Sequence, residues 1–106
     1  MLPKRVELNG NERFKRLLAG TPETAGMKSG YVTLNACESV GEHKTEAREE
    51  AIIVLEGSAE IVVGGKAVFT AAARNLVYIP PETTHDIRNS GEGPLRYVYV
   101  VTPVRP

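Results

Sequence analysis

Short runs of β-type residues separated by strong turn signals dominate the sequence and most restrict what it can fold into. The runs fall at 31–36, 51–55, 60–63, 66–70, 76–79, 85–89 and 96–101. Gly64-Gly65 separates the runs at 60–63 and 66–70, and Pro80-Pro81 follows the run at 76–79. A diglycine readily adopts the positive φ angles of a two-residue hairpin turn. Seven or more short strands without a long helical pattern predict an all-β sandwich or small barrel.

The N-terminal part of the chain is less regular than the rest. A charged stretch at 12–16 suits either one helical turn or an edge strand. Residues 21–30 are rich in Gly, Thr, Pro and Ser and are predicted to form a loop. We therefore divide the chain into an N-terminal segment, 1–30, expected to serve as a strand or a dimer arm, and a barrel, 31–106.

Three of the predicted strands, 51–55, 76–79 and 97–101, are apolar on both faces. A sheet with one face in water would alternate apolar and polar residues instead. Something must therefore cover the outer face of the sheet. We expect a homodimer in which a second copy of the chain does so, with the N-terminal segment as a candidate for crossing over.

Length, charge and cysteine content exclude several classes of function. The 106 residues suffice for one domain, and thirteen Lys and Arg balance thirteen Asp and Glu, which argues against nucleic acid as a partner. The apolar runs are too short to cross a membrane, and no Gly-rich loop opens a helix as nucleotide binding requires. The lone cysteine, Cys37, is predicted to be a small strand residue, not a nucleophile. Together with an N-terminus that lacks a signal-peptide pattern, it favours a reducing, cytoplasmic location.

Two histidines and one glutamate stand out among the polar residues of the predicted strands. His43 and His85 are the only histidines, and each adjoins a β run. Alternation along the strand turns Glu50 to the same side as Ile52 and Val54. An ionised carboxylate in such surroundings must be paired or bound to a metal, and two imidazoles with one carboxylate suit Fe, Mn, Zn, Ni or Cu. The alternatives are exposed turn histidines and a solvated surface carboxylate.

Two stretches of the chain carry these residues at characteristic spacings. In residues 41–57, His43, Glu50 and Gly57 fall on the first histidine, the glutamate and the last glycine of the pattern G-x5-H-x-H-x4-E-x6-G. A second stretch follows G-x5-P-x-G-x2-H-x3-N at its proline, histidine and asparagine, which are Pro80, His85 and Asn89. These patterns resemble the two motifs of the cupins. The resemblance covers 31–103 and implies a double-stranded β-helix, or jelly-roll barrel, with a divalent metal held by His43, Glu50 and His85.

The chain departs from these motifs at four positions. Thr45 replaces the second histidine of the first motif, and three motif glycines fall on Cys37, Arg74 and Glu82. The set of metal ligands is therefore reduced to three, and Thr45 is a poor ligand that could still hydrogen-bond a metal-bound water. At Glu82 a glycine would tolerate positive φ, so we expect a reshaped or mildly strained turn there.

The sequence leaves three functions open. The first is a metal-dependent cupin that acts on a small organic metabolite as a dioxygenase, decarboxylase or isomerase. The second is a non-catalytic module that binds or senses a small molecule with a weak or absent metal site, and the third is a metal-independent isomerase. The pocket in each case is expected to be lined by Thr45, Ile52, Val54 and Ile87.

Most other polar and aromatic side chains are expected to have structural roles, but some arginines and one tyrosine are candidates for contact with a ligand. Arg48 and Arg96 are predicted to face solvent, where either could bind an anionic substrate at the pocket rim. Of the four tyrosines, which mostly serve packing, one is expected to reach the pocket mouth, although the sequence does not identify which. Asn89 is predicted to organise a turn through backbone hydrogen bonds.

Overall fold

The computed structural model describes residues 1–105, and the regular structure in that range is entirely β. The strands are β1 (Phe14–Ala19), β2 (Lys28–Leu34), β3 (His43–Lys44), β4 (Arg48–Glu56), β5 (Ser58–Val63), β6 (Lys66–Ala72), β7 (Leu76–Ile79), β8 (Thr84–Asn89) and β9 (Leu95–Pro103). They form two sheets, one ordered β1-β2-β9-β4-β7 and the other β3-β8-β5-β6. All strand pairs are antiparallel. No helix among these residues is long and apolar enough to span a bilayer.

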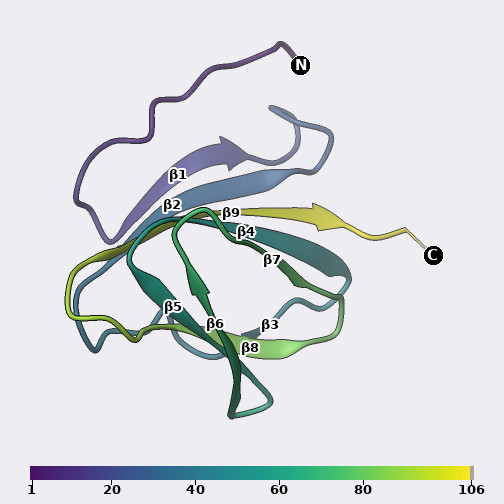
Figure 1. Ribbon diagram of the computed structural model, residues 1–106. Coiled ribbons are helices and arrows are strands. Elements are labelled where there is room, and N and C mark those ends of the chain that lie inside the picture. Colours follow the sequence, from purple (N-terminus) through teal and green to yellow (C-terminus); the bar gives the residue numbers. More distant parts are fainter. Residues whose placement is uncertain (106) are drawn as a thin grey trace.

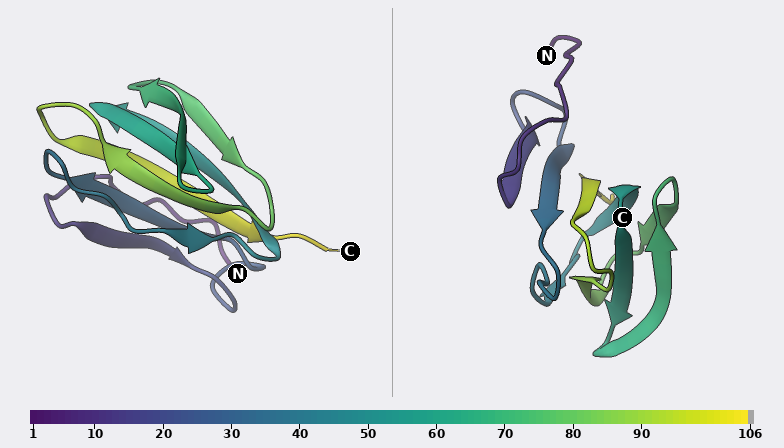
Figure 2. Two further views of the ribbon diagram at one scale, coloured as in Figure 1. Left: turned by 90° about the horizontal axis from the view of Figure 1, so that it is seen from below. Right: turned by 60° about the vertical axis from the view of Figure 1, so that its left-hand side comes forward.

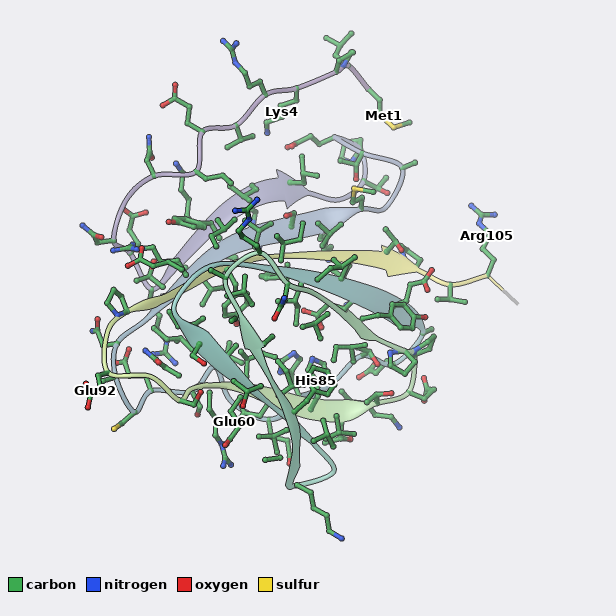
Figure 3. The ribbon with its side chains drawn as sticks, in the orientation of Figure 1. Met1, Lys4, Glu60, His85, Glu92 and Arg105 are labelled. Carbon is green, nitrogen blue, oxygen red and sulfur yellow. The ribbon has the colours of Figure 1, made fainter. Side chains whose placement is uncertain are left out.

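The two sheets face each other and enclose the core between them (Figure 1). Alternation along β4 explains how one strand serves both sides: Ile52 and Val54 are fully buried, whereas Ile53 is 41% exposed. From β8, Ile87 meets them in the same apolar cluster, and Figure 3 places His85 between the sheets. The predicted all-β, double-stranded β-helix fold is thus confirmed.

The diglycine hairpin is also confirmed. Gly64 and Gly65, with φ angles of 59° and 82°, connect β5 and β6, and two consecutive positive φ angles match the twist of the flanking strands. Most strands are longer than the apolar runs that predicted them, because backbone pairing continues into polar residues such as Arg48 at the start of β4.

The N-terminal segment contributes strands to the barrel. Of the two alternatives for the charged stretch, the edge strand holds, since β1 pairs with β2 at the end of the five-stranded sheet (Figure 2). The loop predicted over 21–30 ends earlier than expected, because Lys28 and Ser29 pair with Val101 and Val100 of β9. The boundary drawn between residues 30 and 31 therefore falls inside β2.

The outer face of the five-stranded sheet is covered over only part of its width. Toward β1, Leu17, Tyr31 and Val98 form a second buried cluster, against which Val6 of the chain's own N-terminal segment and Val100 pack. Toward β7, apolar side chains stay exposed; they include Ile53 at 41%, Leu76 at 70% and Tyr78 at 57%. The N-terminal segment thus covers its own sheet in this structure, and the face near β7 is bare.

The three residues that replace motif glycines keep the backbone conformation of glycine. Cys37, Arg74 and Glu82 have φ angles of 68°, 75° and 55°, in the left-handed region that costs a residue with a Cβ about 1–2 kcal/mol. The strained turn expected at Glu82 is therefore present. Cys37 lies in an exposed turn after β2, so its predicted place in a strand is wrong.

Candidate metal centre

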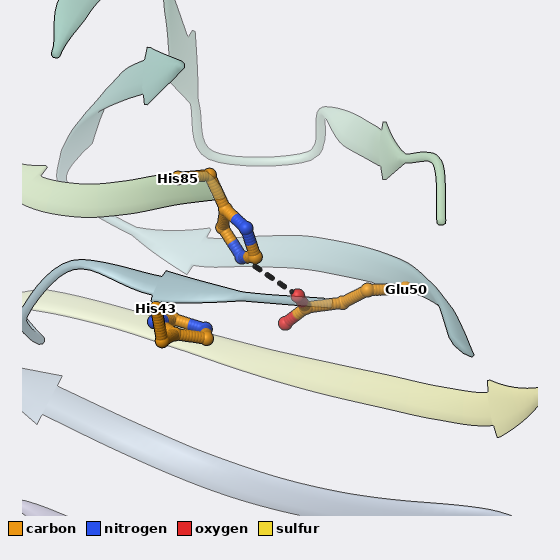
Figure 4. Close-up of side chains that lie close together, drawn as sticks. All are labelled: His43, Glu50 and His85. Carbon is orange, nitrogen blue, oxygen red and sulfur yellow. Dashed lines mark hydrogen bonds and ion pairs between the residues drawn. The ribbon is translucent and has the colours of Figure 1, made fainter. Parts of the chain in front are cut away.

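Strand pairing brings the two histidines together. His43 of β3 and His85 of β8 are direct partners across the antiparallel pair, a position in which Cβ atoms lie about 5 Å apart. Their ring centroids are accordingly 4.2 Å apart. Glu50 reaches the same point from β4 in the opposite sheet, and one ligand atom from each of the three lies within 4.8 Å of the others (Figure 4).

Backbone carbonyls fix which ring nitrogen each histidine presents to this centre. Nδ1 of His43 lies 2.9 Å from the carbonyl oxygen of Gly41, and Nδ1 of His85 lies 3.1 Å from that of Thr83. A carbonyl oxygen accepts hydrogen bonds and cannot donate them, so both Nδ1 atoms carry a proton. In the neutral rings the lone pair is therefore on Nε2, and backbone support of this kind orients metal-binding histidines.

The contact between His85 and Glu50 requires a positive charge between them. Nε2 of His85 lies 2.9 Å from Oε1 of Glu50, and the two side chains are 0% and 8% exposed. A lone pair and a carboxylate oxygen repel at this distance unless a proton or a cation lies between them. Burial alone lowers the pKa of His85, but hydrogen bonds with Glu50 and Thr83 and the nearby charges of Glu50 and Asp86 raise it above its usual value. A proton therefore occupies this contact in metal-free protein, and a metal ion can replace it.

The three residues fit a metal ion in number and type, but their ligand atoms must move slightly closer together to bind the same ion. Ligands bonded at about 2.1 Å are at most roughly 4.2 Å apart, slightly closer than the 4.8 Å limit that encloses this group. His85 and Glu50 are buried, whereas His43 is exposed on the two-residue strand β3. The exposed ring is the one with freedom to close the centre.

A cavity of about 320 Å³ opens beside this centre, within the size range of small-molecule sites. Its lining is Arg13, Phe14, Lys28, Val32, Val40, His43, Lys44, Thr45, Arg48, Glu50, Ile87, Tyr97, Tyr99 and Val101. The expected lining by Thr45 and Ile87 agrees with this set. Ile52 and Val54 do not line the cavity, because both are fully buried within the apolar core.

Comparisons with known proteins identify the family of this chain. The family model described as "Cupin domain" matches residues 30–101, which is most of the chain. The chain belongs to the cupin family. It is 33% identical over 89 residues to "Polyketide synthase CurC" of Streptomyces cyaneus, a match that covers 81% of this cupin and 57% of the relative.

A second relative supports the same assignment, and a solved structure supports the fold. "Tetracenomycin polyketide synthase protein TcmJ" of Streptomyces glaucescens is 30% identical over 89 residues, covering 81% of this cupin and 59% of the relative. The cupin thus spans less than two thirds of the length of either curated relative. A solved RmlC-like cupin with a double-stranded β-helix fold from Methanocaldococcus jannaschii superposes with a TM-score of 0.75, at 17% identity over 97% of this chain and 93% of that one.

Thr45, which replaces a motif histidine, is occupied by backbone groups. Its hydroxyl donates to the carbonyl oxygen of Pro80 at 2.8 Å and accepts from the amide of Thr83 at 3.0 Å. The hydroxyl proton is therefore committed to the Pro80 carbonyl, while one oxygen lone pair remains that could accept from a metal-bound water, so that expectation stays a prediction. The hydroxyl also holds the loop whose Thr83 carbonyl orients His85.

The tyrosines of the cavity could not be identified from the sequence. Tyr97 and Tyr99, together with Val101, share the inner face of β9 and reach the wall. Burial is the main cause that raises the pKa of Tyr97 and of Tyr99, so both phenols stay protonated at neutral pH. Alternation along β9 puts Tyr97 and Tyr99 on the same face of the strand, which was the available signal. Only the pairing of β9 with β2 and β4 shows that this face points into the barrel.

Two other expectations concern the surroundings of the site. Asn89 organises the turn after β8: its amide donates to the carbonyls of Leu34 and Gly93, and its oxygen accepts from the amide of Gly91. Arg96 is engaged by Glu56 and other groups at the surface, whereas Arg48 lines the cavity. Of the two arginines expected at the rim, only Arg48 lies there.

Proposed function

We propose that this cupin binds one divalent transition metal through His43, Glu50 and His85 and acts on a small oxygen-bearing organic substrate in the adjoining cavity. The convergence of one ligand atom from each of these three side chains within 4.8 Å supports this most strongly, because a buried carboxylate must be paired or bound to a metal. Two imidazole nitrogens and one carboxylate suit Fe, Mn, Zn, Ni or Cu.

When bound, such a metal supplies Lewis acidity and, if it is iron, the capacity to activate O₂. The chain's own residues supply the surroundings. Val32, Ile87 and Val101 give the cavity an apolar wall that excludes water, and the protonated phenols of Tyr97 and Tyr99 offer hydrogen-bond donors to substrate oxygens. Both curated relatives carry polyketide synthase names, which favours a ketone- or enol-bearing substrate.

Calorimetric titration of EDTA-treated, desalted protein with Zn²⁺, Mn²⁺ and Ni²⁺, followed by elemental analysis, tests the metal site. We expect one equivalent to bind and Glu50→Gln to weaken binding by at least about tenfold, since a neutral amide replaces an anionic ligand. Glu49→Gln is the matched control, because Glu49 points to the other face and bonds to Tyr78. If Glu50→Gln and His85→Ala both bind metal like the parent protein, the site is wrongly assigned.

A non-catalytic small-molecule module is the second candidate. It is favoured by the engagement of Thr45 with backbone groups, which leaves three protein ligands where the family motif has four. A ligand that raises the melting temperature of metal-free protein, without turnover when metal is restored, would support this alternative over the first.

A further inference from the structure

Cationic side chains gather around the cavity although the chain has no net charge. Arg13, Lys28, Lys44 and Arg48 line it, against the single carboxylate of Glu50. Two of these cations have acidic neighbours: Arg13 lies 3.6 Å from Glu38, and Lys44 lies 3.3 Å from Glu82.

Within residues 1–105, Lys28 and Arg48 have no acidic side chain within 4.0 Å. A cavity with two uncompensated cations attracts an anionic ligand.

Strand register places these two cations beside the metal centre. Lys28 pairs with Val101, and Val101 pairs with Glu50, so the three form one row across β2, β9 and β4. Two strand spacings separate the Cα atoms of Lys28 and Glu50 by roughly 10 Å, and Arg48 precedes Glu50 by two residues, roughly 7 Å, on the same face. An anion held by Lys28 and Arg48 would lie next to the centre without displacing its ligands.

An aromatic wall formed by Phe14 and Tyr99 lies beyond this row. The rings of Phe14 and Tyr99 stack with centroids 6.3 Å apart and planes at 21°. Both lie against Gly30, where an added Cβ would come within 2.5 Å of Phe14 and 2.6 Å of Tyr99. The missing side chain of Gly30 is therefore what admits the two rings to the inner face. Tyr99 precedes Val101 by two residues, roughly 7 Å along β9.

We propose that the cavity binds a flat, unsaturated carboxylate, with its ring against Phe14 and Tyr99 and its carboxylate on Lys28 and Arg48. The roughly 7 Å between Tyr99 and the row of Lys28 and Val101 is similar to the distance from the centre of an aromatic ring, through a carboxylate attached to it, to a group that donates a hydrogen bond to that carboxylate. Aromatic rings favour stacked or edge contacts, and charge-assisted hydrogen bonds to carboxylates are the stronger kind. This inference rests on the proposed function in one respect: the other oxygen atoms of the ligand would face the metal centre formed by Glu50, His43 and His85.

Three probes test the proposal on the intact protein: 2-naphthoate, the neutral 2-naphthalenemethanol with the same ring system, and the smaller, saturated cyclohexanecarboxylate. Affinities are measured by calorimetry in EDTA and again with one equivalent of Zn²⁺. We expect 2-naphthoate to bind about tenfold more tightly than either of the others. Amide shifts in ¹H–¹⁵N spectra should centre on Lys28 and Tyr99.

Variants separate the contribution of the ligand's carboxylate to the affinity from that of its aromatic ring. Lys28→Met should weaken 2-naphthoate about fivefold to tenfold and leave 2-naphthalenemethanol unchanged. Phe14→Leu should weaken 2-naphthoate but not cyclohexanecarboxylate. Lys66→Met, on the exposed start of β6 and outside the cavity, is the matched control.

A preference for 2-naphthoate in EDTA supports this proposal whatever the metal titration gives, so its failure is distinguishable from that of the metal site. Equal affinity for the three probes overturns it, even if Zn²⁺ binds. Unchanged 2-naphthoate affinity in Lys28→Met and Arg48→Met overturns the placement of the carboxylate.

Discussion

The role of Thr45 gives the sharpest test of how this site is built. Replacing Thr45 with Val keeps the shape of the side chain but removes the hydroxyl that bonds to the Pro80 carbonyl and the Thr83 amide. Thr45 is only 6% exposed, so water does not readily replace these bonds. Each is worth about 1 kcal/mol net, and an unsatisfied buried partner costs more. We therefore expect the free energy of unfolding to fall by about 2–3 kcal/mol.

Two measurements check this expectation. Urea unfolding in EDTA gives the loss of stability, which corresponds to a melting temperature lower by roughly 10 °C for a domain of this size. Calorimetric titration with Zn²⁺ gives the effect on the centre, where loss of outer support for a ligand lowers metal affinity by about 10–100-fold. The effect arises because the Thr83 amide loses its side-chain partner, which leaves the Thr83 carbonyl beside His85 held only by the backbone amide of Thr45.

Thr45→Ser is the matched control, since it keeps the hydroxyl and should retain most of the stability and nearly all of the metal affinity. If Val and Ser variants bind Zn²⁺ equally well, Thr45 does not position His85. If Thr45→Val unfolds at the same urea concentration as the parent protein, the two hydrogen bonds contribute nothing and the reasoning from burial is wrong.

Three further predictions concern pH, backbone strain and assembly. In metal-free protein the pair with Glu50 raises the pKa of His85 despite burial. Its stabilisation is therefore complete below the unfolded pKa of about 6.5 and is lost as pH rises through the folded pKa. Urea midpoints in EDTA should fall as the pH is raised above about 6.5, and a flat profile like that of His85→Gln would refute this. Arg74→Gly should stabilise the protein by about 0.5 kcal/mol by relieving its positive φ, whereas Ala73→Gly should destabilise it, and equal unfolding midpoints for the two would contradict the strain. The homodimer stays a prediction: sedimentation should show a dimer that Leu76→Asp dissociates, and a monomeric parent protein would exclude it.

Local rules predicted the parts of the site that lie along single strands. Alternation identified Glu50 as the inward carboxylate, and motif spacing identified His43 and His85, which the register then placed opposite each other. Alternation gives the face of a strand but not the depth along it, so Ile52 and Val54 were expected at the cavity although they lie in the core.

Features that depend on contacts between distant segments could not be predicted in the same way. The engagement of Thr45 requires the position of the loop at 80–83, and the aromatic wall requires the register of β9 with β2. The motif comparison put Cys37, Arg74 and Glu82 at glycine positions, but a strained turn was foreseen only at Glu82, and the positive φ of Glu46 lies outside any motif glycine.

The centre has one rigid half and one that can open. Glu50 lies on the nine-residue strand β4 and His85 on the six-residue strand β8, both inside their sheets, whereas His43 lies on a strand of two residues at the border of its sheet. Fraying of so short a border needs far less energy than unfolding the barrel. A chelator should therefore strip the ion from the folded protein, at a rate that urea well below the unfolding transition hardly changes.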